Sequence, residues 1–383
     1  MPTRSRPLVL IVDDDPDGVT PQKVELEEHV DVIVKDPGAV IARDLRRASL
    51  VLVDYQVSQW PARDSAPELA LKPRDGLALA SVLRSHLAAE DQPRATAFAL
   101  LSGRLKELAG GLPPVYREHS IARSHNLEWV FTKHEAKGRP PFTTQVVALA
   151  RAVRRLPQVW PRDDAAQMAA EVSRLLGLKR RERWYARAWE DIEECHPPFH
   201  ELATASHGLA FLRWMLQRIL PYPCFLIPTP YLAARFHVTP ASLANALRDD
   251  KKLRSKLKPA SYSGVVSDFA GERWWRAGIE DLVWRLTKGR PFDRLLLRTV
   301  AVEKLSTQLV PVELEDPVVC LDGRFNPTDE LADIKDAVEV QPDDWPPYAG
   351  RAWVRLVDAQ QDPGLRAILV LRERDRVEPG QEA

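Results

Sequence analysis

The stretch LVLIVDDDPDG, residues 8–18, decides the fold of the N-terminal part of the chain. Five apolar residues lead directly into three consecutive aspartates, so like charges stand side by side where a buried strand would end. Clustered carboxylates repel one another unless a cation lies between them. The pattern therefore predicts a strand whose carboxyl end belongs to a polar site.

Further apolar runs of the same kind follow within the first 157 residues. They are rich in β-branched residues and end in polar ones: VDVIV (30–34), LVLVD (50–54), ATAFALL (95–101) and LEWVF (127–131). Helical spacing of apolar residues separates them at 37–49, 75–90 and 143–156, with a short helix expected at 23–29. Strands that are apolar on both faces belong to parallel sheets covered by helices. We therefore expect an α/β domain with a doubly wound five-stranded parallel sheet.

Polar residues follow four of these strands. Asp13 and Asp14 follow the first, Asp54 ends the third, Ser102 follows the fourth, and Lys133 follows the fifth. In an open α/β sheet the binding crevice lies beyond the carboxyl ends of the strands, so these side chains should meet at one edge. Oxygen ligands without histidine or cysteine favour a hard cation, Mg2+ or Mn2+. A carboxylate beside such an ion and a lysine can attack a phosphoryl group.

This set of residues resembles the receiver domain of two-component response regulators. The acidic pair in LVLIVDDDPD, the aspartate in LVLVDYQV, the hydroxyl in FALLSG and the lysine in WVFTKHE stand in the family's order over about residues 5–157. The resemblance implies a flavodoxin-like fold in which Asp54 is the phosphoacceptor. It also implies that Asp13, Asp14, Asp54 and the backbone carbonyl of Gln56 hold Mg2+, while Ser102 is the switch hydroxyl and Lys133 binds the phosphoryl group. The phosphoryl donor would be a histidine kinase or a phosphotransfer protein.

The sequence departs from the family pattern around the lysine. His134 stands where the family has proline, and Val130 stands where it has an aromatic switch residue, with Trp129 next to it. The connections at 57–74 and 103–126 are longer than the family's. These departures bear on switching more than on phosphoacceptance.

The remaining chain suggests two further segments. Formal net charge is +0 for all 383 residues, but residues 158–300 are basic and residues 301–383 are acidic. We expect a receiver domain at 1–157, a helical, tryptophan-rich output domain at 158–300 with helices at 165–195 and 207–220, and a small β or α+β module at 301–383 with a disordered tail. Strands of the last module are expected at VAVEKL (300–305), LVPVEL (309–314), VVCLDG (318–323), AWVRLVD (352–358) and RAILVLRERD (366–375).

The segment 229–258 has the pattern of a helix-turn-helix, a helix pair that many DNA-binding proteins use. A tight turn at His237–Thr239 joins two helical patterns, and Pro240 suits the first position of the second helix. Five residues are the candidate DNA contacts: Thr239, Ser242 and Asn245 toward bases, and Lys251 and Lys252 toward phosphates. A helical hairpin with a purely structural role has much the same pattern.

The composition favours a soluble protein of the cytoplasm, and the resemblance implies that it acts in signalling. The cysteines Cys195, Cys224 and Cys320 are odd in number and far apart, which is typical of reduced thiols. No uncharged apolar run is long enough to span a membrane, so no membrane association is expected. Neutral net charge, abundant tryptophan and an acidic C-terminal segment favour an output through an unidentified protein partner. The alternative is a DNA-binding transcriptional regulator. No nucleophile–base pair or phosphate-binding loop is recognisable, so an enzymatic output is not predicted.

Overall fold

The computed structural model describes residues 6–57, 73–89, 94–113, 116–133, 140–204 and 208–377. Its N-terminal part is built on a five-stranded sheet in the order β2-β1-β3-β4-β5, in which all neighbouring strands are parallel. The strands are β1 (Leu8–Val12), β2 (Asp31–Lys35), β3 (Leu50–Asp54), β4 (Ala97–Ser102) and β5 (Trp129–Thr132). The strand order is that of the flavodoxin-like doubly wound fold, which confirms the predicted α/β class.

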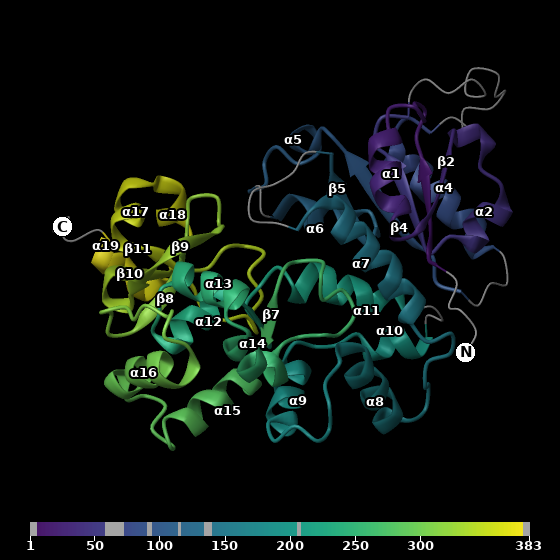
Figure 1. Ribbon diagram of the computed structural model, residues 1–383. Coiled ribbons are helices and arrows are strands. Elements are labelled where there is room, and N and C mark those ends of the chain that lie inside the picture. The colour runs from purple at the N-terminus through teal and green to yellow at the C-terminus, as the bar shows by residue number, and fades with distance from the viewer. Residues whose placement is uncertain are drawn as a thin grey trace.

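Helices cover both faces of this sheet (Figure 1). One face packs against α1 (Thr20–Glu27) and α7 (Phe142–Arg155), and its strand residues include Val9 and Ile11. The other face, with Leu10 and Val12, packs against α2 (Ala42–Arg47), α4 (Gly76–Ala88) and α6 (Arg117–Ser124). The short helix α5 (Leu105–Leu108) precedes α6. Successive strand residues point to opposite faces, and both sets are buried because helices cover both faces.

The helix expected at 37–49 is shorter than predicted. A single 3-10 turn, η1 (Pro37–Ala39), comes first, and α2 begins only at Ala42. The carboxylate of Asp36 accepts a hydrogen bond from the N–H of Gly38 at 2.8 Å, and Val40 has an extended backbone. Asp36 thus caps the start of this turn, and the extended backbone of Val40 ends it before an α-helix can propagate.

The middle of the chain is mainly helical, as predicted. Its helices are α8 (Ala165–Leu176), α9 (Tyr185–Glu194), α10 (Phe199–Thr204), α11 (Leu209–Trp214), α12 (Thr229–Phe236), α13 (Pro240–Asp249), α14 (Lys251–Leu257), α15 (Arg276–Leu286) and α16 (Arg294–Val300). Two π-helical segments, η4 (Met215–Ile219) and η6 (Ala301–Leu305), extend α11 and α16, and the 3-10 turn η5 (Lys258–Ala260) follows α14. The short strands β6 (Leu226–Pro228) and β7 (Arg273–Trp275) pair antiparallel.

The single helix expected over 165–195 is two helices. Gly177, in the left-handed conformation with φ 70°, ends α8, and the N–H of Leu178 returns to the carbonyl of Ser173 at 2.9 Å. The residues after this cap turn the chain before α9 starts at Tyr185.

The C-terminal module is a four-stranded sheet with short helices, in the order β10-β11-β8-β9. Its strands are β8 (Pro317–Leu321), β9 (Pro327–Asp333), β10 (Ala337–Val340) and β11 (Ala352–Arg355). The 3-10 turn η7 (Ile334–Asp336) joins β9 to β10, and α17 (Leu356–Gln361), α18 (Pro363–Ala367), the 3-10 turn η8 (Leu371–Glu373) and α19 (Arg374–Val377) follow β11. Strands at VVCLDG and AWVRLVD are confirmed: β8 starts one residue earlier than predicted and ends two residues earlier, and β11 starts where predicted but ends where α17 begins.

Three of the expected C-terminal strands are wrong. Residues 300–305 are helical because Leu297, Ala301 and Leu305, at helical spacing, face a buried cluster. Residues 309–314 form no strand, although Pro311 makes an isolated bridge with Val238. Residues 366–375 are largely helical: Asp362 caps α18, which ends at Ala367, by accepting from the N–H of Gly364 at 2.7 Å, and η8 and α19 follow from Leu371. β9 and β10 were not anticipated.

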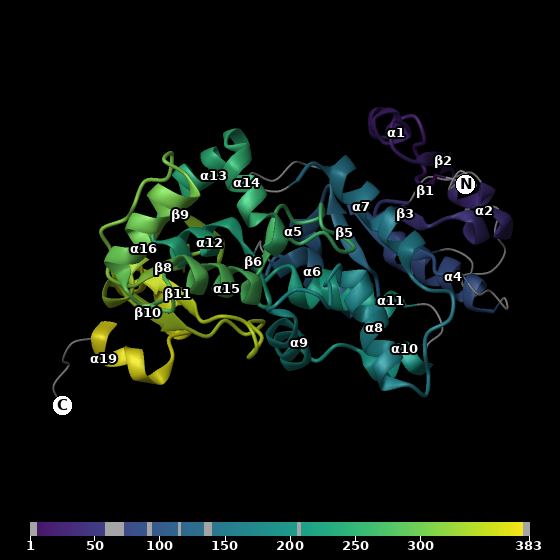
Figure 2. The same ribbon diagram turned by 60° about the horizontal axis from the view of Figure 1, so that its bottom comes forward.

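One buried apolar cluster joins the three parts of the chain. It begins on the α7 face of the first sheet, continues through α8–α11, and includes side chains of β10, β11 and α17 in the C-terminal module. Figures 1 and 2 show the first sheet at one end of the molecule and the C-terminal module at the other. Among the described residues, the helices are all too short or too polar to cross a bilayer. The proposed boundaries at 157 and 300 stay a prediction.

Candidate functional site

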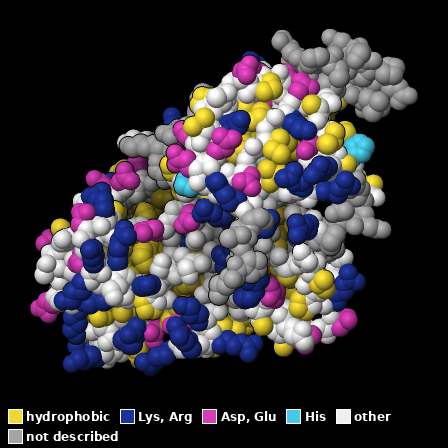
Figure 3. Space-filling model, turned by 45° about the vertical axis from the view of Figure 1, so that its right-hand side comes forward, with side chains coloured by type: hydrophobic (Ala, Val, Ile, Leu, Met, Phe, Trp, Pro, Cys, Tyr) yellow, Lys and Arg dark blue, Asp and Glu magenta, His cyan; other side chains and the backbone are white. Residues whose placement is uncertain are grey.

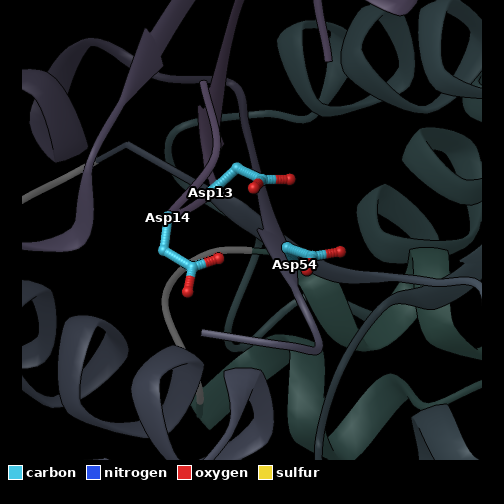
Figure 4. A group of neighbouring side chains, drawn as sticks. All are labelled: Asp13, Asp14 and Asp54. Carbon is cyan, nitrogen blue, oxygen red and sulfur yellow. The ribbon is translucent and has the colours of Figure 1, made fainter. Parts of the chain in front are cut away.

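The predicted site residues of the first domain gather at the carboxyl edge of its sheet. Asp13 and Asp14 follow β1, Asp54 is the last residue of β3, Ser102 is the last residue of β4, and Lys133 follows β5. Figure 4 shows the carboxylates of the three aspartates around a common space. The parallel register explains the arrangement, because it aligns the strand ends: Val12 pairs with Val53, and Asp54 pairs with Leu101.

The three carboxylates are close enough to share one cation. One oxygen from each of Asp13, Asp14 and Asp54 lies within 4.8 Å of the other two. Asp13 and Asp54 are almost fully buried, with 3% and 4% of their surface exposed, and Asp14 is half-buried. Asp15, the third aspartate of the run, is exposed. The candidate metal ligands are therefore two buried carboxylates at the floor of the site and one half-buried carboxylate at its rim.

Backbone hydrogen bonds fix the orientation of the two buried carboxylates. The N–H of Asp15 donates to Asp13 Oδ1 at 2.9 Å, and the N–H of Gln56 donates to Asp54 Oδ2 at 3.0 Å. The second oxygens face Lys133, whose Nζ lies 2.8 Å from Asp54 Oδ1 and 3.8 Å from Asp13 Oδ2. One ammonium group therefore serves two carboxylates. That the carbonyl of Gln56 also binds a metal stays a prediction.

The environment of Asp13 fits a cation. Its Oδ2 is buried and has no hydrogen-bond partner among the described residues. Burial, opposed by the backbone hydrogen bond and reinforced by the charge of Asp54, raises the pKa of Asp13 from 3.8 to about 6. A buried carboxylate oxygen without a donor, beside further carboxylates, is the donor set that Mg2+ or Mn2+ accepts.

This raised pKa predicts a pH-dependent stabilisation by Mg2+. The pKa of Asp13 is higher in the folded chain than in the unfolded chain, so protonation of Asp13 stabilises the fold. This stabilisation by protonation is lost as the pH rises through about 6. A bound cation favours the ionised form instead. We expect Mg2+ to raise Tm clearly at a pH well above this pKa and much less at a pH well below it, as measured by differential scanning fluorimetry. Free Mg2+ at about ten times Kd would contribute about 1.4 kcal/mol. An equal shift at both pH values, or an Asp13→Asn variant that needs no more Mg2+ than the unchanged protein for the same shift, would contradict the assignment.

Ser102 is buried beside the carboxylates. It has 1% of its surface exposed, and its Oγ accepts a hydrogen bond from the N–H of Arg104 at 3.0 Å. Its carbonyl accepts from the N–H of Lys133 at 3.0 Å, which ties the serine and the lysine together through the backbone. The hydroxyl is therefore connected directly to the loop that leads to α5 and α6.

Gly76 belongs to the site, although the sequence alone did not single it out. It is the first residue of α4, and its N–H donates to the carbonyl of Tyr55 at 2.8 Å. A Cβ at this position would lie 2.0 Å from the carbonyl oxygen of Asp54, so the close contact requires glycine. The pair Asp75-Gly76 before a helical pattern is the signal that could have drawn attention to it.

Trp129 and Val130, which precede Lys133 on β5, lie on opposite faces of the sheet. Val130 is fully buried on the α4 face of the sheet, whereas Trp129 points to the opposite face. The ring of Trp129 lies 5.1 Å from that of Phe269, edge to face, so this tryptophan packs against the middle region. His134 lies outside the described residues.

Two of the candidate DNA-contacting residues in 229–258 have hydroxyls that already make hydrogen bonds within the chain. The Oγ1 of Thr239 caps α13 by accepting from the N–H of Ser242 at 3.3 Å. The Oγ of Ser242 donates to the carbonyl of Thr239 at 2.9 Å and accepts from the N–H of Val310 at 3.1 Å. Backbone bonds also tie the turn to this neighbouring segment, with the N–H of Thr239 donating to Val310 at 2.8 Å. These residues therefore lie against residues 310–312.

The other candidate DNA contacts are on the surface. Asn245 is exposed, and its side-chain oxygen accepts from Arg248 Nη2 at 2.8 Å. Lys251 and Lys252 are exposed at the start of α14. The two helices of the motif are present, joined by His237 in the left-handed conformation with φ 53°.

Comparisons with known proteins add little to this geometry. No family model and no curated protein matches the chain. Two solved structures overlap with it: "Conformational dynamism for DNA interaction in Salmonella typhimurium RcsB response regulator" (15% identity, 55% of this chain, 92% of that chain, TM-score 0.26) and "Structure of the two-component response regulator RcsB-DNA complex" (16% identity, 56% of this chain, 100% of that chain, TM-score 0.24). Both are described as response regulators. At such TM-scores the overlap carries no argument, so the interpretation depends on the sheet and the site.

Proposed function

We propose that the chain is a response regulator-like signalling protein that accepts a phosphoryl group on Asp54 from a histidine kinase or a phosphotransfer protein. The main support is the 2.8 Å contact of Asp54 Oδ1 with Lys133 Nζ beside the carboxylates of Asp13 and Asp14. Asp54 is the central residue of this group, because it contacts the ammonium and is held in place by the backbone N–H of Gln56.

The residues have distinct roles in the proposed transfer. An oxygen of Asp54 attacks phosphorus, the bond from phosphorus to the donor nitrogen breaks, and that nitrogen keeps the electron pair and takes a proton from solvent. Lys133 holds the nucleophile and then balances charge on the phosphoryl oxygens, as a lysine does in other phosphoryl transfers. Mg2+ held by Asp13, Asp14 and Asp54 would neutralise further charge there. The Ser102 hydroxyl would donate to a phosphoryl oxygen.

A route from the site to the rest of the chain supports a signalling role. Ser102 accepts from Arg104, which precedes α5 and α6. On α6, Ser120 Oγ donates to Asp344 Oδ2 at 2.8 Å, and Arg123 Nη2 donates to Asp344 Oδ1 at 2.7 Å. Asp344 belongs to the C-terminal module. Added charge at Asp54 would shift the loop after Ser102 and so change this contact.

We further propose that the output is an interaction with a protein partner. The hydroxyls of Thr239 and Ser242 already make hydrogen bonds within the chain, whereas the reading of bases needs available hydrogen-bonding groups on the second helix. This favours a protein partner over DNA. DNA binding would instead predict a steep loss of affinity with salt and a dependence on Lys251 and Lys252.

The test of phosphoacceptance uses the full chain and a small phosphodonor, acetyl phosphate. We expect intact-mass spectrometry to show one added phosphoryl group in Mg2+ and none when EDTA replaces the metal. The adduct should disappear in hydroxylamine, which cleaves acyl phosphates but not phosphate esters. An adduct that forms equally in EDTA, or that resists hydroxylamine, would rule out an aspartyl phosphate in this site.

A further inference from the structure

An apolar groove lies between α2 and α4, away from the carboxylate cluster. It has a volume of about 360 Å³, and its walls are formed by η1, the start of α2 and the outer face of α4. Its lining residues include Ile41, Leu45, Leu79, Val82, Leu83 and His86. On α4, Leu79, Val82, Leu83 and His86 follow the 0, 3, 4, 7 spacing of a helix face that packs against another helix.

The groove leaves apolar side chains open to solvent. Leu45 and Leu83 form a buried floor, with 3% and 7% of their surface exposed. Ile41 and Val82 form the lips, with 55% and 36% exposed. A concave apolar surface with exposed lips is typical of a binding groove rather than of isolated surface residues.

Helix α2 gives one wall of the groove a positive charge. Arg43 and Arg47 are exposed on α2, and α4, which forms the other wall, contains no acidic residue. The acidic residue of α2, Asp44, is buried and pairs with Lys35 Nζ at 2.6 Å, so its charge is compensated. Figure 3, which brings this side of the molecule forward, shows hydrophobic side chains next to Lys and Arg on its upper part. An occupant with acidic flanks would complement this rim.

The groove and the phosphoacceptor share one helix. The first residue of α4, Gly76, packs so tightly on Asp54 that a Cβ there would lie 2.0 Å from its carbonyl oxygen. Further along the same helix, Val82 and Leu83 line the groove. A shift of α4 therefore cannot occur without an effect at both places.

We propose that this groove binds an acidic amphipathic helix of a partner protein. Two helical walls with apolar residues at helical spacing suit a third helix, whose apolar face fills the groove while its acidic flanks meet the arginines of α2. The inference deepens the proposed function, because it names the chemistry of the partner that the signalling domain engages.

The test is a selection against the full chain without phosphodonor or Mg2+. The probe is a displayed library of random peptides of about 16 residues, which is about four helical turns. We expect enrichment of acidic sequences with apolar residues three and four positions apart. A synthetic peptide of the enriched consensus should bind saturably in fluorescence anisotropy, more weakly at high salt, and a version with the same composition in scrambled order should not bind. Enrichment without acidic bias, or equal binding of the scrambled peptide, would overturn the proposal.

A matched pair of variants tests whether the consensus peptide binds in the groove. Val82→Glu is expected to weaken the consensus peptide about tenfold or more, because it puts a like charge at an apolar lip. Val24→Glu, which changes a valine that is 57% exposed on α1, is the control and should leave binding unchanged. Circular dichroism checks that both variants fold. Equal affinity of the peptide for the two variants would show that it binds at a different site. A dimer in sedimentation velocity that Val82→Glu abolishes would show that a second copy of the chain occupies the groove. Phosphorylation by acetyl phosphate is measured separately, so either result can fail without the other.

Discussion

Asp54→Asn is expected to abolish the incorporation of a phosphoryl group from acetyl phosphate. The substitution keeps the shape of the side chain and an acceptor for the N–H of Gln56, but it removes the anionic oxygen that lies 2.8 Å from Lys133. A neutral amide is a poor nucleophile toward phosphorus, so the adduct should fall to background. The measurement is intact-mass spectrometry in Mg2+ over a time course.

The matched control for this variant is Asp75→Asn. Asp75 is also an aspartate near the site, directly before Gly76, but its Oδ1 caps α4 by accepting from the N–H of Ala78 at 2.9 Å, a role that asparagine also fills. We expect normal phosphorylation in this control. A phosphoryl group retained in Asp54→Asn would place the acceptor elsewhere and remove the central proposal.

Asp13→Asn separates the roles of the two buried carboxylates. It leaves Asp54 as the nucleophile but lowers the negative charge at the shared cation position. We therefore expect phosphorylation to persist with a higher requirement for Mg2+, in contrast to the complete loss in Asp54→Asn. This difference follows from the separate contacts of the two residues, since only Asp54 lies within hydrogen-bonding distance of Lys133.

The site could be predicted from the sequence to the extent that it depends on strand ends. Five-residue apolar runs of β-branched residues identify buried parallel strands, and the topology then brings Asp13, Asp54, Ser102 and Lys133 to one edge. The close packing of Gly76 on Asp54 could not be predicted in the same way. It depends on how closely the first residue of α4 approaches the carbonyl of Asp54, which no local pattern specifies.

Other parts of the fold depend on contacts between distant segments. Residues 300–305, VAVEKL, have the composition of a strand but are helical, since Leu297, Ala301 and Leu305 pack into a cluster with α12–α15. Two of the candidate base-contacting residues, Thr239 and Ser242, hydrogen-bond to Val310, which lies about seventy residues later in the chain. Trp129 likewise packs on Phe269 of the middle region. Local periodicity cannot reveal such partners.

Arg213→Ala is expected to lower the free energy of unfolding by about 3 kcal/mol, because it removes the cation that is hydrogen-bonded to a buried carboxylate. Glu128, just before β5, has a side chain that is 0% exposed, and its Oε1 accepts from Arg213 Nε of α11 at 2.9 Å. The other oxygen, Oε2, accepts from the N–H of Phe98 in β4. This ion pair therefore ties the edge of the first sheet to the middle region, and chemical denaturation monitored by circular dichroism measures its contribution.

A matched control and a second background test this interpretation. Arg285→Ala removes an arginine from an exposed i,i+4 pair with Asp281 at 2.9 Å and should lower stability by less than about 1 kcal/mol. In a Glu128→Gln background, Arg213→Ala should be much less destabilising, because the glutamine leaves no buried charge while its side-chain oxygen can still accept from Phe98. If Arg213→Ala were as mild as Arg285→Ala, or equally harmful in both backgrounds, the buried charge would not be the cause. The coupling between the two substitutions thus measures how much the Arg213–Glu128 pair contributes to holding the first sheet against the middle region.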